Sequence, residues 1–334
     1  MPREPFTQPR GASGRFVNLD GSGPPPWSAV FRWAVVDRLA GRRRRSPDRA
    51  PIARVEPDVA RLATPPAPGE PARITWLGHA SFLLQLDRVS LLVDPVLRDT
   101  IVGGIQRNVG PGLPIESLPP IDAVLVTHVH YDHLDLPTLA RVGAPVVAGL
   151  GVGRYLGERV PAVSELSWWS SLEVGGVRVS FVPAQHWNRR GPFDPNAALW
   201  GGFVVEGRGA SVYHAGDTAL FDGFRQIGAA FAGLDAALLP IGAYDPAWFM
   251  ERQHLNPEQA LRAFQILGAR TFVAMHFGTF KLTDEPLDEP PRRLLAERDR
   301  LGIPADRVKV LPVGGSLEVL GGAAASREVA AREP

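Results

Sequence analysis

Thr127-His128-Val129-His130-Tyr131-Asp132-His133 places four side chains that can bind metal within six residues, directly after the apolar run 123–126. Imidazole and carboxylate together suit zinc or a similar borderline metal. A helix would turn these side chains onto different faces, so the motif fits a loop that folds around an ion. The alternative is a solvated polar turn, but such a turn does not require three histidines so close together. The sequence therefore predicts a metal-binding loop at the end of a buried strand.

The composition limits how such a metal can be held. The chain has 334 residues, enough for one large domain or two modest ones. Its 36 basic and 35 acidic side chains nearly cancel, so no net field attracts nucleic acid. Cysteine is absent, which excludes disulfides, thiolate ligands and thiol nucleophiles. Any metal must therefore be bound by histidine and carboxylate alone.

The first part of the chain carries no recognisable targeting signal. Residues 1–23 are polar with scattered arginines, unlike the apolar core of a signal peptide. No run reaches the roughly 20 apolar residues that a spanning helix needs. We therefore expect a cytoplasmic protein, with peripheral contact at the inner membrane surface as an open alternative.

Residues 1–72 are expected to form an N-terminal extension. Residues 1 to about 26 are rich in Gly, Pro and Ser and should be loosely ordered, whereas 27–40 predicts a helix followed by the basic run 42–45. Residues 51–71 look like a proline-rich connector. The helix is apolar on several sides, which favours docking on the main domain. The alternative is insertion at a membrane interface through residues 27–45, with the arginines facing anionic lipid.

Residues 73–322 should form the main domain, and 323–334 a disordered tail. Alternating or continuous apolar patterns predict strands, and 3.6-residue periodicity predicts helices. The strands are expected at 74–77, 81–86, 90–93, 123–127, 146–148, 177–182, 203–205, 211–214, 236–239, 271–275 and 308–311, and the helices at 136–142, 221–231, 257–267 and 291–300. Many strands interspersed with helices indicate a layered α+β or α/β fold.

Three later polar residues also stand just beyond apolar strands. His186 follows the strand 177–182, Asp217 follows 211–214, and His276 follows 271–275. Ligands collect at such strand ends in layered sheets. If the strands lie side by side, seven residues converge: His128, His130, Asp132, His133, His186, Asp217 and His276. That is the ligand count for two metals that share one carboxylate.

The motif His-x-His-x-Asp-His at 128–133, with the later His, Asp and His in this order, resembles the metallo-β-lactamase superfamily. The resemblance implies a four-layer αββα sandwich with two zinc ions at one edge. His128, His130 and His186 would bind one zinc, Asp132, His133 and His276 the second, and Asp217 would bridge them. No ligand is missing from the pattern.

Further stretches resemble the branch of N-acylphosphatidylethanolamine-hydrolysing phospholipases D. They are Phe16-Val17-Asn18, Trp76-Leu77-Gly78-His79-Ala80, Asp94-Pro95, Leu118 to Ala123, Ile241 to Tyr244, Trp248-Phe249-Met250 and Gln253-His254, so the likeness covers about 16–320. It implies cleavage of a phospholipid phosphodiester into N-acylethanolamine and phosphatidic acid. Phe277 is a departure, because mammalian members carry Trp there, which affects the pocket lining alone.

By this resemblance, Asp132 would orient the attacking water while also binding metal. His254 would contact the phosphate region of the substrate, with Tyr131 on the opposite side. A surface histidine in the loop before the helix at 257 is an equally open interpretation of His254. We expect His79, His214 and Asp94 to support the site without binding metal. Trp168 and Trp169 should fill the core, and Trp248 stays open.

The metal centre leaves other reactions open. A hydrolase of a sugar lactone or a β-lactam, or a general phosphodiesterase, could share it, because the pocket decides the substrate. A nuclease is disfavoured because no basic patch with interleaved aromatic residues is present. A metal-binding sensor without catalysis would be expected to lose a ligand, and a di-iron oxidoreductase to carry a carboxylate where this chain has His130. A homodimer also stays open.

Overall fold

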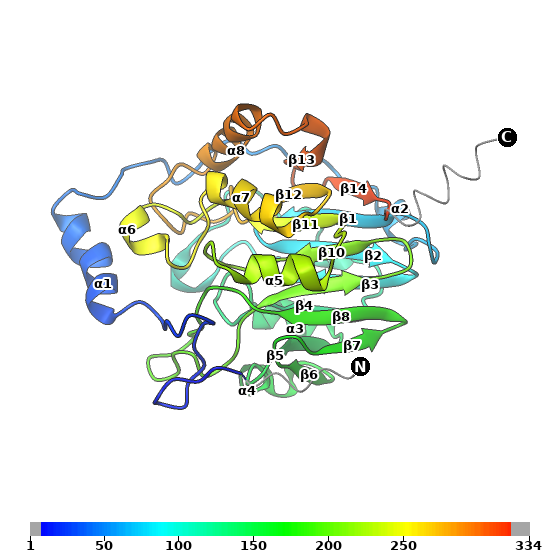
Figure 1. Cartoon of the computed structure of the whole chain (residues 1–334), viewed down its shortest axis with the longest axis horizontal. Coiled ribbons are helices and arrows are strands. Elements are labelled where there is room, and N and C mark those ends of the chain that lie inside the picture. The colour runs from blue at the N-terminus through cyan, green and yellow to red at the C-terminus, as the bar shows by residue number, and fades with distance from the viewer. Residues whose placement is uncertain (1–7, 322–334) are drawn as a thin grey trace.

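Two mixed β-sheets lie face to face at the centre of the molecule, in a computed structural model that describes residues 8–321 (Figure 1). The first sheet runs in the order β14 (Ser316–Val319), β1 (Ala72–Gly78), β2 (Ser81–Leu86), β3 (Val89–Val93), β4 (Ala123–Val126), β5 (Val146–Gly149) and β6 (Val163–Leu166). The second runs in the order β13 (Val308–Lys309), β12 (Thr271–Met275), β11 (Ala236–Pro240), β10 (Ser211–His214), β9 (Gly202–Glu206), β8 (Val177–Val182) and β7 (Ser171–Val174).

Helices cover the outer face of each sheet. On the first sheet these are α3 (Leu136–Val142) and α4 (Gly153–Leu156), and on the second α5 (Gly223–Ala230), α7 (Pro257–Leu267) and α8 (Glu289–Arg300). The remaining helices are α1 (Trp27–Phe31), α2 (Val59–Leu62) and α6 (Ala247–Met250). Short helical turns occupy 102–104, 115–117, 157–159 and 305–307. The order helix, sheet, sheet, helix confirms the predicted four-layer αββα sandwich.

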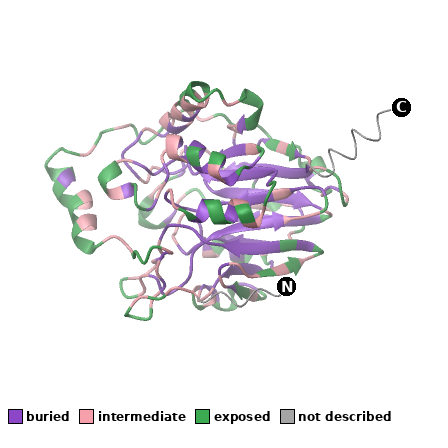
Figure 2. Cartoon of the chain, viewed as in Figure 1, coloured by how far each residue is buried: buried purple, intermediate pink, exposed green. Residues whose placement is uncertain are grey.

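The period of two along the strands divides the apolar side chains between two cores. On β2, Phe82 and Leu84 pack between the sheets, while Leu83 points to the core under α3 and α4. On β4, Leu125 faces the inner core and Val126 the outer one. Because successive side chains point to opposite faces, each strand of the first sheet serves both layers. Figure 2 shows the strands as the buried centre of the molecule.

The predicted elements are recovered with small shifts at their ends, but the four-residue helices α2, α4 and α6 and three strands were missed. The missed strands are β6, β7 and β14, whose side chains are largely exposed or half-buried. Each stands at or near the edge of its sheet, where polar side chains face solvent and the apolar pattern is short. Helix α7 matches its prediction, with Asn256 and Gln259 forming a capping box.

The N-terminal extension packs more closely than its composition predicts. Phe16 and Asn18 are each only 2% exposed, and Phe16 joins the main hydrophobic core. The expectation of loose order up to residue 26 is therefore wrong around these residues. Leu62 of α2, within the predicted connector, is also 2% exposed. The predicted tail 323–334 lies outside the described residues.

The helix predicted at 27–40 is present but changes character along its length. α1 ends at Phe31, and a wider π-helical segment continues over Arg32–Asp37. Figure 1 shows α1 beside α6 at one end of the molecule, away from the strands, and Figure 2 shows it largely exposed. Between residues 8 and 321, no helix has the length and apolar character needed to cross a bilayer.

Candidate metal centre

The two sheets bring the predicted metal-binding residues to one edge. In the first sheet β1, β3 and β4 run in the same direction, and in the second so do β8, β10 and β12. The loops after their carboxyl ends carry His79, Asp94 and the 128–133 motif from the first sheet, and His186, Asp217 and His276 from the second. Ligands in layered folds bind at such edges.

The 128–133 motif forms a loop, as predicted. The backbone N–H groups of His133 and Leu134 both donate to the carbonyl of His130, at 3.1 and 2.9 Å, which closes a tight turn. The N–H of Val129 donates to Oδ1 of Asn188 at 2.7 Å. These bonds turn the four side chains of the motif toward the second sheet.

Three imidazoles form the first group. Nδ1 of His130 lies 3.0 Å from Nε2 of His128 and 3.2 Å from Nε2 of His186. Nitrogen ligands at about 2.0–2.1 Å around a tetrahedral ion are roughly 3.3 Å apart. The spacing of the three nitrogens therefore fits a shared ion.

Asp132, His133 and His276 form the second group, next to Asp217. Oδ2 of Asp132 lies 3.5 Å from Nε2 of His276 and 3.6 Å from Nε2 of His133. Asp217 lies between the two groups. Its oxygens are 3.1 and 3.3 Å from Nε2 of His276 and His133, and 3.9 Å from Nε2 of both His128 and His186. All seven predicted ligands are thus brought together, with Asp217 between the two groups.

Several buried polar atoms in this cluster have no hydrogen-bond partner among the described residues. They are Nδ1 of His79, Nε2 of His130, Nε2 of His133, Oδ1 of Asp217, Nδ1 of His254 and both ring nitrogens of His276. Leaving a buried polar group unsatisfied costs about 1–3 kcal/mol. Metal ions coordinated by these side chains would satisfy several of these atoms together, so the residues present fit the predicted pair of ions.

The pKa values divide the histidines of the cluster into two sets. Burial lowers the pKa of His130 to about 3 and of His186 to about 4, so both rings are neutral at pH 7 and offer lone pairs. Burial alone would also lower the pKa of His276, but Asp217 and Asp132 raise it to about 9. The pKa of His133 is raised for the same reason. Metal binding would displace these protons from the second group.

Neighbouring groups orient the ligand rings. Nδ1 of His133 donates to Oδ2 of Asp94 at 2.7 Å, and Nδ1 of His186 donates to the carbonyl of Gln253 at 2.9 Å. With these nitrogens occupied, Nε2 of each ring faces the centre. His214 donates through Nε2 to the carbonyl of Ala80 at 2.9 Å, and its Nδ1 accepts from the N–H of Gly216, next to Asp217, at 3.1 Å. The supporting positions predicted for Asp94 and His214 agree with these contacts.

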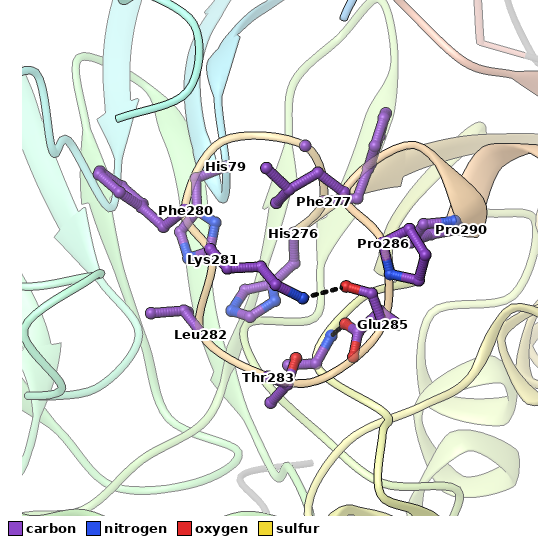
Figure 3. A pocket seen from close by; sticks show the side chains of 13 residues that line it. His79, His276, Phe277, Phe280, Lys281, Leu282, Thr283, Glu285, Pro286 and Pro290 are labelled. Carbon is purple, nitrogen blue, oxygen red and sulfur yellow. Dashed lines mark hydrogen bonds between the residues drawn. The ribbon is translucent and has the colours of Figure 1, made fainter. Parts of the chain in front are cut away.

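His79 packs on the second group. Its Nε2 lies 2.9 Å from Oδ2 of Asp132, and its ring centre is 4.0 Å from that of His276. Figure 3 shows the two rings together on one wall of a cavity of about 10 Å³, the size of one water. Nζ of Lys281 donates to the carbonyl of Glu285 at 2.5 Å, which holds the loop after His276 closed around this cavity.

Three non-glycine residues at the centre adopt left-handed backbone conformations. The φ angles are 56° at His79, 42° at Asp94 and 61° at His276. Such conformations are uncommon for non-glycine residues and persist where the surroundings enforce them. Their clustering at the strand ends is typical of a functional site.

His254 belongs to the centre rather than to the surface. Its Nδ1 lies 3.8 Å from Oδ2 of Asp217, its ring centre is 5.1 Å from that of His186, and its side chain is 12% exposed. The alternative of a surface histidine is therefore wrong. Tyr131 lines the same cleft, and its hydroxyl donates to the carbonyl of Arg190 at 2.6 Å.

A cleft of about 440 Å³ opens above the two groups, with His130, Asp132, Asp217, His254 and His276 at its floor. Its walls are mainly apolar and include Val30, Trp33, Ile101, Val102, Ile105, Trp187, Phe249, Met250 and Leu282. The ring of Trp33 stacks on Phe249, with centres 5.3 Å apart. Sequence reasoning missed most of these walls, although Trp187 directly follows the predicted ligand His186.

Trp168 is buried as predicted, Trp169 is half-buried, and Trp248 is 40% exposed.

Residues 90–277 match the Beta-lactamase superfamily domain. An uncharacterised protein of Mycobacterium tuberculosis is 36% identical over 92% of this chain and 85% of its own length. An N-acyl-phosphatidylethanolamine-hydrolyzing phospholipase D of Caenorhabditis elegans is 36% identical over 66% of this chain and 68% of its own. A metal-dependent hydrolase of Methanopyrus kandleri is 34% identical over 74% and 99%.

A solved structure shares the fold. It is a metallo hydrolase of the archaeon Ignicoccus hospitalis, with a TM-score of 0.56 and 24% identity over 74% of this chain and 97% of that one.

Proposed function

This chain belongs to the β-lactamase superfamily and is a metal-dependent hydrolase of that superfamily, and we propose that its substrate is N-acylphosphatidylethanolamine. Cleavage of the phosphodiester would give N-acylethanolamine and phosphatidic acid. The observation that carries the proposal is the two-group His and Asp cluster at the floor of an apolar cleft. Relatives that are 34–36% identical to this chain over the aligned stretch include phospholipases of this kind.

We assign the metal-binding roles from the geometry. His128, His130 and His186 would hold one zinc ion, and Asp132, His133 and His276 the other. Asp217, between the groups, would bind both. When bound, two such ions supply a nucleophile at neutral pH and offset the negative charge that develops on the phosphoryl oxygens.

Asp132 and His254 are the residues that we propose to act on the reacting atoms. Asp132 borders the cleft with a 14% exposed side chain, and His79 holds one of its oxygens at 2.9 Å. Its other oxygen is then available to orient the attacking water. Burial holds the pKa of His254 well below its ordinary value, so the ring is neutral at pH 7. Such a ring can donate one hydrogen bond to a phosphoryl oxygen, with Tyr131 flanking the substrate on the cleft wall.

The walls of the cleft support a lipid rather than a sugar. A sugar lactone presents hydroxyl groups that need several polar partners, whereas the walls above the cluster are mainly aliphatic and aromatic. An acyl chain needs only apolar contact, worth about 0.8 kcal/mol for each buried CH₂. The metal centre alone would accept either a lactone or a phospholipid, and the apolar lining of the cleft favours the phospholipid.

The outer side of α1 and of its helical continuation supports peripheral contact with a membrane. Trp27, Phe31, Val35 and Leu39 follow one another at four-residue steps, and their exposed fractions are 62, 59, 38 and 84%. Exposed apolar side chains in a row on a helix are typical of interfacial insertion. Arg38 and Arg45 lie in the same segment, where they can face anionic lipid. We propose that residues 27–45 contact the membrane from which the substrate is drawn.

The proposed function is tested by hydrolysis of N-acylphosphatidylethanolamine in mixed micelles by the zinc-loaded protein, beside bis(p-nitrophenyl) phosphate and a lactone. We expect release of N-acylethanolamine that is abolished by chelator and restored by zinc. Turnover of the small phosphodiester alone would retain the chemistry and reject the lipid. Cleavage of the lactone alone would reject phosphodiester hydrolysis altogether.

A further inference from the structure

The N-terminal segment reaches the metal centre through one buried carboxamide. The side-chain Nδ2 of Asn18 donates to the carbonyl of His186 at 2.9 Å, and its Oδ1 accepts from the N–H of His186 at 3.0 Å. Asn18 therefore binds both main-chain polar groups of a predicted metal ligand. The two residues are 168 positions apart in the chain.

The orientation of this carboxamide is fixed by further contacts. Oδ1 of Asn18 also accepts from Nε1 of Trp200 at 3.1 Å, and Nδ2 also lies 3.1 Å from Oγ of Ser22. An amide oxygen accepts and an amide nitrogen donates, so these partners permit only one orientation of the group. Asn18 is 2% exposed, and water cannot take the place of these bonds readily.

The ring of His186 is held independently of its main chain. Its Nδ1 donates to the carbonyl of Gln253, which leaves Nε2 facing Nδ1 of His130 at 3.2 Å. The ring contact fixes the rotation of the imidazole, and the Asn18 contacts fix the main chain from which it projects. Both are needed to place Nε2, because a ligand atom moves with its backbone as well as with its side-chain torsions.

The same segment is linked to the loop that carries Asp217. Nε2 of Gln185 donates to Oδ2 of Asp20 at 2.8 Å, and the N–H of Gln185 donates to Oγ1 of Thr218 at 3.0 Å. The stretch with His186 is thereby held between residues 18–22 on one side and the Asp217 loop on the other. Residues 18–22 lie outside the matched family domain at 90–277.

We propose that Asn18 is a positioning residue of the metal centre: it holds the main chain of His186 so that Nε2 stays in the group formed with His128 and His130. The inference requires that the centre binds metal, and it does not depend on which bond is hydrolysed. It makes the N-terminal segment a part of the metal centre.

The test compares zinc affinity and zinc content in Asn18→Ala and in the parent protein. Affinity is measured by competition with a chromophoric chelator, and content by elemental analysis. Loss of a contact that orients a ligand costs 10–100-fold in metal affinity. We expect a loss of about that size for one ion per chain. Asn18→Asp serves as a second variant, because it keeps the side-chain shape and both acceptor contacts and loses the donation to His186.

Gln85→Ala is the matched control. Gln85 is also a fully buried carboxamide that ties an N-terminal residue to the sheet, since its Nε2 donates to the carbonyl of Leu62 at 2.8 Å. It lies away from the metal-binding loops, so Gln85→Ala should lower the melting temperature and leave zinc affinity unchanged.

A double-mutant cycle with His186→Ala distinguishes an effect of Asn18 on the position of His186 from a general destabilisation of the fold. Once the ring of His186 is gone, Asn18→Ala should weaken zinc binding no further. The proposal is overturned if folded Asn18 variants keep zinc affinity within about twofold of the parent, or if Asn18→Ala weakens binding equally with and without His186.

Discussion

Asp94 and His133 form a fully buried pair at the edge of the first sheet, with Nδ1 of His133 2.7 Å from Oδ2 of Asp94. The carboxylate also accepts from the N–H and the hydroxyl of Thr127, at 2.8 and 2.6 Å. Thr127 directly precedes the metal-binding motif. One carboxylate therefore fixes both the start of the motif and its last ligand.

Asp94→Asn should weaken metal binding while preserving the fold. Asn tolerates the left-handed backbone at this position (φ 42°) and can keep a bond to the Thr127 N–H. It lacks the charge that supports the His133 ring, so we expect zinc affinity to fall 10–100-fold. Chelator competition measures this, and an unchanged affinity would mean that the pair serves only folding.

Asp217→Ala should abolish binding of both metals and all activity, with the fold retained. The carboxylate approaches histidines of both groups, at 3.1–3.9 Å. Zinc content by elemental analysis and circular dichroism test the two parts of this prediction. An active variant with a full complement of zinc would contradict the bridging role.

His254→Ala should leave zinc content unchanged and slow turnover, by roughly 100-fold for a group that acts on the reacting atoms. Its ring lies beside Asp217 but outside the seven assigned ligands. Steady-state kinetics on a phosphodiester, run at equal zinc loading, give the answer. Parental kinetics would show that the ring only lines the cleft.

Removal of zinc should lower the melting temperature. Without metal, several buried polar atoms of the centre have no partner, and an ion that binds only the folded chain stabilises it by about 2.7 kcal/mol at 100 times its Kd. For a chain of this size that amounts to several degrees. Thermal unfolding is followed with chelator and during zinc titration. Asp217→Ala is the control, and a zinc-dependent rise of the same size in that variant would place the stabilising ion elsewhere.

Phe31→Asp and Leu39→Asp should reduce binding to anionic vesicles without slowing hydrolysis of bis(p-nitrophenyl) phosphate. Both side chains are on the exposed side of the N-terminal helical segment, where a carboxylate opposes insertion. Val59→Asp on α2 is the matched control, because Val59 is 44% exposed and belongs to a different helix. If the first two variants sediment with the vesicles as fully as the parent protein does, the proposed membrane contact is rejected.

The sequence predicted the centre better than its surroundings, for a physical reason. His186, Asp217 and His276 were found because each follows a buried strand, and parallel strands bring such ends together. The helix at 257 was found from its capping residues. These signals are local, so a pattern along the chain reveals them.

The contacts that depend on distant segments left no such signal. Asn18 stands in a stretch whose composition indicates loose order, yet it is buried against His186. The cleft wall at 101–105 has no regular pattern, and it faces Trp33 only because the chain folds back. The partners of these residues are chosen by the tertiary structure, so no window of sequence contains them.

The helix α1 and its continuation have two apolar sides with different neighbours. Val30 and Trp33 line the cleft, whereas Trp27 and Phe31 face outward. If the outward side rests in lipid, the substrate reaches the centre by lateral diffusion within a leaflet, without crossing bulk water. The relevant concentration is then a surface density, and diluting the substrate with an inert lipid at constant total volume should slow the reaction.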